Sequence, residues 1–311
     1  MSMRRIKIIG YGSYLPENKI TFGDQIRYRC SEGVSQIDMA ESACKEALRS
    51  AGITMGDIDL ILYGGAVPAQ LIPATATLLH ERLAKGMGIP AFDVNSSCSS
   101  FITALDIASL YIEAGQYKTI LVVGCDKASA GLNEKQPESF ELFSDAAAAV
   151  IVTKTELSQG VVVSVQKTFS EGAHATEIRA GGALHPGYDY KEEDRDEYFF
   201  DMKGRAALFS TARYLPGVFE AFFKDNHLSM EDIDLIIPHQ ASKALSMFMS
   251  RMNVPEGKYM DCVTQYGNMV AASVPFLLCK ALSTGKIGEG STVLLCGTAA
   301  GLTINLLLLQ L

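Results

Sequence analysis

Residues 55–64 read MGDIDLILYG and residues 230–239 read MEDIDLIIPH, so six of ten positions are identical in two segments that start 175 residues apart. In both, the Asp-Ile-Asp-Leu-Ile run leads into a nearly continuous apolar stretch, which is typical of a strand covered on both faces of a sheet. Each segment follows a stretch with helical periodicity. The first such stretch, residues 40–51, is ended by Gly52, and the second spans residues 204–225. This repeated order of helix and strand is the main sequence evidence for the fold.

A second pair of segments repeats in the same order. ILVVGCD at 120–126 resembles VLLCGTA at 293–299, at a spacing of 173 residues. Two matches at nearly equal spacing indicate two βαβ-rich halves, which we place at residues 1–155 and 156–311, meeting near a strand at 146–154. Strands that alternate with helices predict an α/β fold with mainly parallel sheets.

Composition and charge exclude several classes of protein. The 311 residues are 48% hydrophobic and 20% charged, as in ordinary globular proteins, and the net charge of −8 argues against nucleic-acid binding. No apolar run is long enough for a membrane span, and the N-terminus lacks the apolar stretch of a signal peptide. The seven cysteines lack Cys-x-x-Cys pairs and nearby histidines. This pattern favours a reduced, cytoplasmic protein without disulfides or a bound metal.

Cys98 lies where a predicted strand, residues 91–94, hands over to a predicted helix that starts at Ser99 and ends at Gly115. At such a turn the helix dipole favours a thiolate, and backbone N–H groups can hold the oxyanion that forms on a thioester carbonyl. An arbitrary cysteine is usually a small buried hydrophobe. Cys98 differs because small polar residues surround it, which suits a crowded turn. The cysteines that we interpret as buried are Cys44, Cys125, Cys262, Cys279 and Cys296.

The second half supplies two polar partners. His239 ends the predicted strand DLIIPH, at the carboxyl edge where α/β sites gather, and a helical stretch is predicted from Gln240. Asn268 lies in TQYGNMVAAS, which we interpret as a strand, a glycine turn and a helix. A lone histidine or a turn asparagine is usually structural. Under the repeat, however, Cys98 corresponds to about Ala271, so all three elements are expected to meet between the halves.

The order of these motifs resembles the β-ketoacyl-acyl carrier protein synthase III family of the thiolase superfamily. The resemblance covers nearly the whole chain, and its motifs are GYGSYLPE (10–17), AFDVNSSCSSF (91–101), DMKGR (201–205), IIPHQAS (236–242), YGNMVAASVP (266–275) and GLT (301–303). It implies a thiolase fold, in which the two halves form a five-layer αβαβα architecture.

The resemblance also implies a chemistry. The family's triad maps onto Cys98, His239 and Asn268, and its oxyanion donors map onto the backbone N–H groups of Cys98 and Ala300. An acyl group from acyl-coenzyme A or an acyl-carrier protein would load onto Cys98 and then condense with a decarboxylating malonyl-carrier protein, in fatty-acid or polyketide-type biosynthesis. The substrates are thioesters of coenzyme A or phosphopantetheine, and no metal or redox cofactor is expected.

The chain departs from the family pattern around the entrance. Family members usually carry a Trp and an Arg that grip the adenine of coenzyme A, but this chain has a shorter stretch there and no Trp. Thr298 stands where a bulky Phe is common, and Lys243 precedes the position of the family's docking Arg. For carrier docking we expect a basic patch of Lys203, Arg205, Arg213, Lys243 and Arg251. The resemblance also implies a homodimer, which we expect to pair through the strand near Cys125.

Three other interpretations remain open on the sequence. A biosynthetic thiolase would use a second cysteine, and Cys296 lies near the corresponding loop. An acyltransferase would pass the acyl group from Cys98 to an alcohol or amine without decarboxylation. A non-catalytic scaffold would have no need of an intact Cys98, His239 and Asn268.

Overall fold

The computed structural model describes residues 3–311, and within them the central feature is a nine-stranded sheet with the order β11-β12-β13-β8-β1-β7-β6-β4-β5. Its strands are β1 (Arg4–Tyr14), β4 (Leu60–Gly64), β5 (Ala91–Asp93), β6 (Thr119–Asp126), β7 (Ala146–Lys154), β8 (Gly160–Thr168), β11 (Leu235–Pro238), β12 (Thr292–Ala299) and β13 (Thr303–Gln310). Two small two-stranded sheets are formed by β2 (Lys19–Phe22) with β3 (Gln25–Tyr28), which make a hairpin, and by β9 (Thr176–Glu177) with β10 (Asp201–Met202). The two parts of the large sheet meet only where Arg4 and Arg5 of β1 pair with Val161 and Gly160 of β8.

The sheet contains the same arrangement twice. The order β1-β7-β6-β4 in one part matches β8-β13-β12-β11 in the other, with β4–β6 and β11–β12 parallel and β6–β7 and β12–β13 antiparallel. A single bridge from Ile236 to Tyr259 occupies the place that β5 has beside β4. The prediction of mainly parallel sheets was wrong, because β13 runs back antiparallel to β12, and β1 pairs antiparallel with both β7 and β8. The division after residue 155 stays a prediction.

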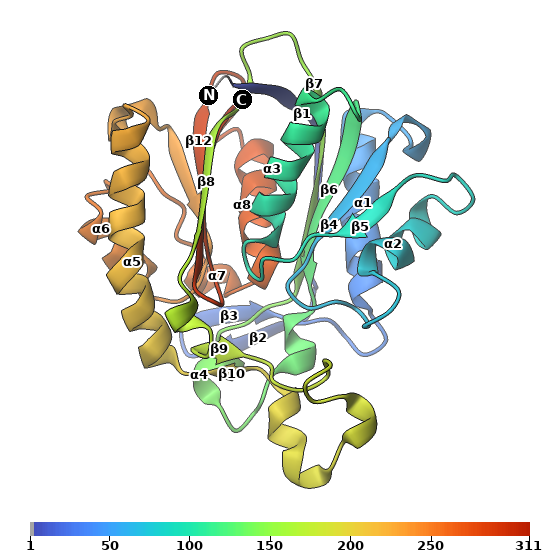
Figure 1. The fold of residues 1–311 in the computed structure, drawn as a ribbon, viewed down its shortest axis with the longest axis vertical. Coiled ribbons are helices and arrows are strands. Elements are labelled where there is room, and N and C mark those ends of the chain that lie inside the picture. The colour runs from blue at the N-terminus through green and yellow to red at the C-terminus, as the bar shows by residue number, and fades with distance from the viewer. Residues whose placement is uncertain (1–2) are drawn as a thin grey trace.

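Helices form three layers around the two parts of the sheet, which confirms the five-layer thiolase fold (Figure 1). The helices α1 and α2 cover one outer face, α3 and α8 lie side by side in the middle, and α5 and α6 cover the other outer face. The α-helices are α1 (Gln36–Ala51), α2 (Thr75–Leu83), α3 (Ser100–Glu113), α4 (Pro137–Phe140), α5 (Gly204–Asp225), α6 (Leu245–Arg251), α7 (Val263–Tyr266) and α8 (Ser273–Ser283). The short 3-10 helices are Met55–Asp57, Ala128–Gly131, Ser170–Gly172, Gly187–Asp189, Glu192–Tyr198, Met230–Asp232 and Val270–Ala272.

The repeated Asp-Ile-Asp motif has a structural cause in both halves. The first aspartate of each motif, Asp57 or Asp232, forms a capping box with the residue three positions before it. The second aspartate accepts a hydrogen bond from the first residue of the neighbouring strand in the sheet. Asp59 accepts the Thr119 N–H of β6 at 2.9 Å, and Asp234 accepts the Thr292 N–H of β12 at 2.7 Å. The motif therefore fixes where β4 and β11 enter the sheet.

The middle helix α3 is held tightly between the two parts of the sheet. A Cβ atom added at Gly64 of β4 would lie 2.9 Å from the Phe101 nitrogen, and one added at Gly297 of β12 would lie 2.5 Å from Ser99 Oγ. No side chain fits in such spaces, so both glycines are required for this close approach. The start of α3, where Cys98 lies, is thereby fixed against strands from both halves.

The expected dimer strand is not at an edge. The strand with Cys125 is β6, whose two sides are already paired with β4 and β7, so the prediction that subunits join through it was wrong. The edge on that side of the sheet is β5. No helix within residues 3–311 is long and apolar enough to span a membrane.

Candidate active site

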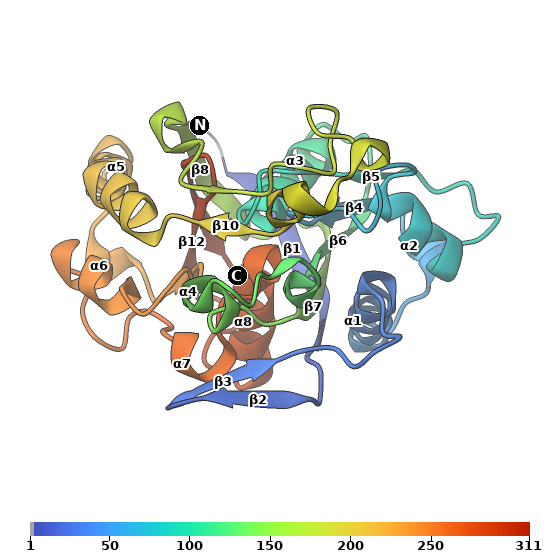
Figure 2. The ribbon, with the colours of Figure 1, turned by 90° about the horizontal axis from the view of Figure 1, so that it is seen from below.

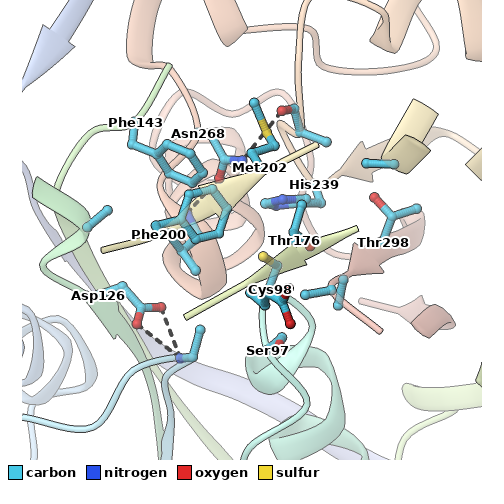
Figure 3. Close-up of a pocket in the computed structure, with 18 of the residues that line it drawn as sticks. Ser97, Cys98, Asp126, Phe143, Thr176, Phe200, Met202, His239, Asn268 and Thr298 are labelled. Carbon is cyan, nitrogen blue, oxygen red and sulfur yellow. Dashed lines mark hydrogen bonds between the residues drawn. The ribbon is translucent and has the colours of Figure 1, made fainter. Parts of the chain in front are cut away.

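A cavity of about 1090 Å³ contains Cys98, His239 and Asn268 and is also lined by residues of α4, β9 and β10, elements that lie at one end of the molecule (Figures 1 and 2). Figure 3 shows the Cys98 sulfur, the His239 ring and the Asn268 side chain directed into the same space. The three residues come from the start of α3, the end of β11 and the turn before α8. The structure therefore brings together the residues that the sequence singled out.

Cys98 is held by a strained turn. Ser97 has a positive φ of 54°, and its N–H donates to Asn95 Oδ1 at 2.9 Å. The N–H of Ser96 donates to Ser100 Oγ at 2.9 Å. A non-glycine residue with positive φ persists only where its surroundings hold it, and such positions often lie at functional sites. The turn thus presents Cys98 at the N-terminal end of α3.

The turn before α8 repeats these features at a spacing of 173 residues. Val270 has φ 51°, and its N–H donates to Asn268 Oδ1 at 2.8 Å. The N–H of Met269 donates to Ser273 Oγ at 3.0 Å. The predicted correspondence between Cys98 and Ala271 is confirmed. The strand predicted before Asn268 was wrong, since residues there form α7, which ends at Gly267 with φ 69°.

Arg27 supports the backbone before Asn268. This arginine is completely buried, and its guanidinium donates to the carbonyl oxygens of Val263 at 3.1 Å and Glu141 at 2.8 Å. Burial lowers the pKa of Arg27 to about 10. The Asn268 side-chain nitrogen lies 3.5 Å from the Ala241 carbonyl oxygen, at the limit of a hydrogen bond, so its N–H groups have capacity for a ligand.

His239 is a neutral base in this cavity. Its backbone N–H donates to the Cys296 carbonyl at 2.7 Å, and the buried Gln240 amide donates to Pro238 and Met260 carbonyls, so the turn after β11 is fixed. Burial lowers the pKa of the ring to about 4, and Nδ1 has no hydrogen-bond partner among residues 3–311. The helix expected from Gln240 begins later, at Leu245, because the Gln240 side chain holds the segment in a turn.

The thiol of Cys98 is protonated in the free protein. Burial and the nearby Asp126 charge raise its pKa to about 12, although the N–H groups of Ala300 and of Cys98 itself act in the opposite direction. These N–H groups favour the thiolate, as expected at the start of a helix, but desolvation of the thiolate outweighs them. The Ala300 N–H is nevertheless placed beside the thiol, where an oxyanion on a bound thioester would form.

Asp126 was not singled out from the sequence. Its carboxylate, at the end of β6, lines the cavity and accepts backbone N–H groups from Ala66, Val67 and Ala271, each at 3.0 Å (Figure 3). Burial raises its pKa to about 7, against the effect of these hydrogen bonds. The available signal was its position directly after a buried strand, at the carboxyl end where α/β sites gather.

Comparison with known proteins places this geometry in a family. The model described as 3-Oxoacyl-[acyl-carrier-protein (ACP)] synthase III matches residues 92–178, and the model of its C-terminal part matches residues 223–311. A beta-ketoacyl-[acyl-carrier-protein] synthase III of Aquifex aeolicus is 32% identical over 98% of this chain and 99% of its own length. One of Clostridium perfringens is also 32% identical, over 99% of this chain and all of that protein. The chain belongs to this family.

The solved structures of synthase III proteins agree with this assignment. The enzyme of Aquifex aeolicus matches with a TM-score of 0.87 and 30% identity, covering 98% of this chain and all of that one. The enzyme of Thermus thermophilus has a TM-score of 0.87 at 26% identity, with 98% of both chains covered. The family resemblance inferred from the motifs is confirmed.

The predicted docking residues of this synthase III family member lie on or just before α5, in the turn after β11 and at the end of α6. Arg205 lines the cavity, and the neighbouring Lys203 lies 3.7 Å from the Glu177 carboxylate. Lys243 forms an exposed ion pair of 3.1 Å with Asp24, at the tip of the β2–β3 hairpin. Arg213 on α5 stacks over Tyr214, and Arg251 ends α6. Their role in docking stays a prediction.

Two other predicted residues lie on the strand β12. Thr298 faces the cavity (Figure 3), and Cys296 lies deeper on the same face of the strand. Burial raises the pKa of Cys296 to about 12. Among residues 3–311 no group of three or more His, Cys, Asp or Glu side chains is arranged to hold a metal ion.

Proposed function

We propose that this protein is a β-ketoacyl-acyl carrier protein synthase III that joins an acyl group on Cys98 to a malonyl thioester with loss of carbon dioxide. The observation that carries the proposal is the meeting of Cys98, His239 and Asn268 in one cavity, beside the Ala300 N–H. A nucleophile, a neutral imidazole and an amide N–H donor are the groups that the two half-reactions need.

In the first half-reaction Cys98 takes the acyl group. Its sulfur attacks the carbonyl of an acyl thioester, the bond to the carrier sulfur breaks, and the thiol proton ends on that sulfur. A thiol with a pKa of about 12 requires a base at neutral pH, and the neutral His239 ring can relay the proton. The N–H groups of Cys98 and Ala300 stabilise the oxyanion.

In the second half-reaction a malonyl thioester enters. The N–H groups of His239 and Asn268 donate to its thioester carbonyl and stabilise the enolate that remains when the carboxylate leaves as carbon dioxide. The enolate carbon attacks the acyl carbon, and the bond to the Cys98 sulfur breaks. A β-ketoacyl thioester departs, and the thiolate takes up a proton from water.

Acyl-coenzyme A or an acyl-carrier protein supplies the first group, and malonyl-acyl carrier protein supplies the second. The names of the two sequence relatives described above specify an acyl-carrier protein, and this supports the carrier. Carrier docking through the basic residues predicts that Arg251→Glu with Lys243→Glu weakens the malonyl step, and that salt diminishes the difference. Unchanged carrier kinetics at low salt would remove the docking proposal.

All seven cysteines, which lie within residues 3–311, are free thiols, and this supports a cytoplasmic location.

The active protein is a homodimer that pairs through β5. This strand is an edge of the sheet, and large apolar side chains near it are exposed, including Met87, Phe92, Leu71 and Ile72. Unpaired strand edges and exposed apolar side chains favour association. Sedimentation of the wild type should show a dimer, and Phe92→Lys should shift it toward monomer; a wild type that is monomeric at all concentrations would refute this.

The deciding experiment measures the two half-reactions separately. Intact-protein mass after incubation with acyl-coenzyme A should show an adduct on Cys98, and addition of malonyl-carrier should remove the adduct with release of carbon dioxide. A scaffold gives no adduct. Loss of the adduct to an alcohol or amine without carbon dioxide indicates a plain acyltransferase, and loss to acetyl-coenzyme A indicates a thiolase.

A further inference from the structure

The cavity continues past the catalytic residues into the outer layer of the second half. The most buried part of its wall there is formed by side chains of α5, α6, β12 and the turn after β12 that are at most 7% exposed. We call this part the C-terminal lobe, and its residues are Leu215, Leu245, Phe248, Met249, Cys296 and Leu302. These side chains border the same cavity as Cys98, so a chain attached to that thiol can extend toward them.

The lobe is suited to hydrocarbon. Five of its six side chains are aliphatic, aromatic or thioether groups, and the thiol of Cys296 stays neutral because burial raises its pKa to about 12. The amide groups of a phosphopantetheine arm would lose their hydrogen bonds to water against such walls, which is unfavourable. A methylene chain has no such groups and gains free energy when it leaves water.

Thr298 stands at the entrance of the lobe. It lies two residues after Cys296 on β12, so both side chains project from the same face of the strand, and it borders the space in front of Cys98 and His239 (Figure 3). Its neighbours Ala299 and Ala300 are also small. Small residues at this point leave the route from the Cys98 sulfur into the lobe open.

We propose that the C-terminal lobe binds the hydrocarbon chain of a medium or long acyl group carried on Cys98. The substrate class is therefore a medium- or long-chain acyl thioester rather than an acetyl thioester. This inference rests on the proposed function, since the chain must be attached to Cys98. An acetyl group would leave the lobe without an occupant, whereas each further methylene in the lobe should raise the specificity constant for acylation about fourfold.

The test measures acylation of Cys98 by intact-protein mass for saturated acyl-coenzyme A donors from acetyl to hexadecanoyl. The wild type should prefer octanoyl and longer donors by at least about 10²-fold over acetyl. Thr298→Phe should abolish this preference, because it slows acylation by octanoyl and longer donors far more than acylation by acetyl-coenzyme A. Thr298→Val, which keeps the shape of the side chain, is the matched control and should retain the preference for the longer donors. Phe248→Leu, which enlarges the lobe, should move the optimum to longer chains.

Three outcomes would overturn the inference. A wild type that prefers acetyl, or a Thr298→Phe variant that slows all donors equally while it melts at the wild-type temperature, would show that no acyl chain occupies the lobe. A Thr298→Phe variant with weakened inhibition by free coenzyme A would assign the lobe to the pantetheine arm. Absence of an adduct with every donor in every variant would instead refute the proposed function itself.

Discussion

The turns at Asn95–Cys98 and Asn268–Ala271 have the same backbone and different chemistry. In each turn an asparagine side chain accepts a hydrogen bond from the backbone N–H two residues later, and that later residue has a positive φ. In each turn a serine at the start of the helix accepts a hydrogen bond from a backbone N–H four residues before it. In the second turn the N–H of Ala271 is bound by the Asp126 carboxylate, from the end of β6. The residue at the equivalent end of β12 is Ala299, which has no carboxylate to offer Cys98.

Under the proposed function, this difference leaves only the first turn able to hold an oxyanion. The N-terminal end of a helix favours negative charge, and in the second half the Asp126 carboxyl group already accepts the Ala271 N–H. In the first half the N–H groups of Cys98 and Ala300 remain available beside the thiol. The second turn instead contributes the side chain of Asn268. Under the proposed function, one repeated structure thus provides the nucleophile in one half and the enolate donor in the other.

The largest effect should come from replacing Cys98 of the first turn with alanine, the residue that stands at the equivalent position, Ala271, in the second turn. Cys98→Ala should abolish the acyl adduct completely, because it removes the nucleophile, and should leave the melting temperature nearly unchanged, since the site is a turn beside a cavity. The control is Cys44→Ala, in a buried position of α1, which should retain the adduct. Intact-protein mass with labelled acyl-coenzyme A decides it, and a labelled Cys98→Ala protein would contradict the assignment.

Placing a carboxylate beside the turn that contains Cys98 should have the next largest effect. Ala299→Asp places a carboxylate where Asp126 lies in the other half, so it competes with the oxyanion for the N–H of Cys98. Acylation should slow by about 10²-fold or more, as when an oxyanion donor is lost. Ala299→Asn has the same size without the charge and should slow it less. Equal rates for Ala299→Asp and the wild type in single-turnover acylation would disprove the equivalence of the two sites.

Removing the charge of Asp126 should change the pH dependence of Cys98 reactivity and of protein stability. Asp126→Asn removes a charge that raises the pKa of Cys98, so alkylation of Cys98 by iodoacetamide should begin at lower pH. The folded pKa of Asp126, about 7, lies above its unfolded value, so its contribution to stability is full below about pH 4 and declines as pH rises to 7. The wild type should lose stability relative to Asp126→Asn over that window, by about 1.4 kcal/mol for each unit of the pKa shift. Parallel stability curves in urea at pH 4 and pH 8 would show that Asp126 titrates normally.

The smallest effect is expected on protein stability at acidic pH, through protonation of His239. Its folded pKa of about 4 lies below the unfolded value, so the neutral ring contributes stability above about pH 6.5 that is lost as pH falls through 4. His239→Gln, which cannot be protonated, should therefore lose less stability than the wild type between pH 6.5 and pH 4. Denaturant unfolding at the two pH values measures the difference. A larger loss in His239→Gln would show that the ring is charged in the folded protein.

The parts of this picture that follow from local sequence were predictable. The Asp-Ile-Asp motifs, Gly52 at the end of α1, the bounds of α5 and the turn around Cys98 depend on neighbouring residues. The contacts of Asp126 with Ala271 and of Arg27 with Val263 were not predictable, because these partners lie more than 100 residues away along the chain. The directions of β7 and β13 and the edge position of β5 also depend on tertiary pairing, which periodicity does not reveal.

The central claim is that the two equivalent turns serve different half-reactions, and the paired variants Asn95→Ala and Asn268→Ala test it most directly. Each removes the same side-chain hydrogen bond within its turn. Acyl-adduct formation and carbon dioxide release from malonyl-carrier are measured for both proteins. Asn268→Ala should retain acylation and lose decarboxylation by about 10²-fold, because it removes an enolate donor. Asn95→Ala should slow acylation and retain decarboxylation. If both variants lose the two half-reactions in equal proportion, the turns do not divide the chemistry and the account is wrong.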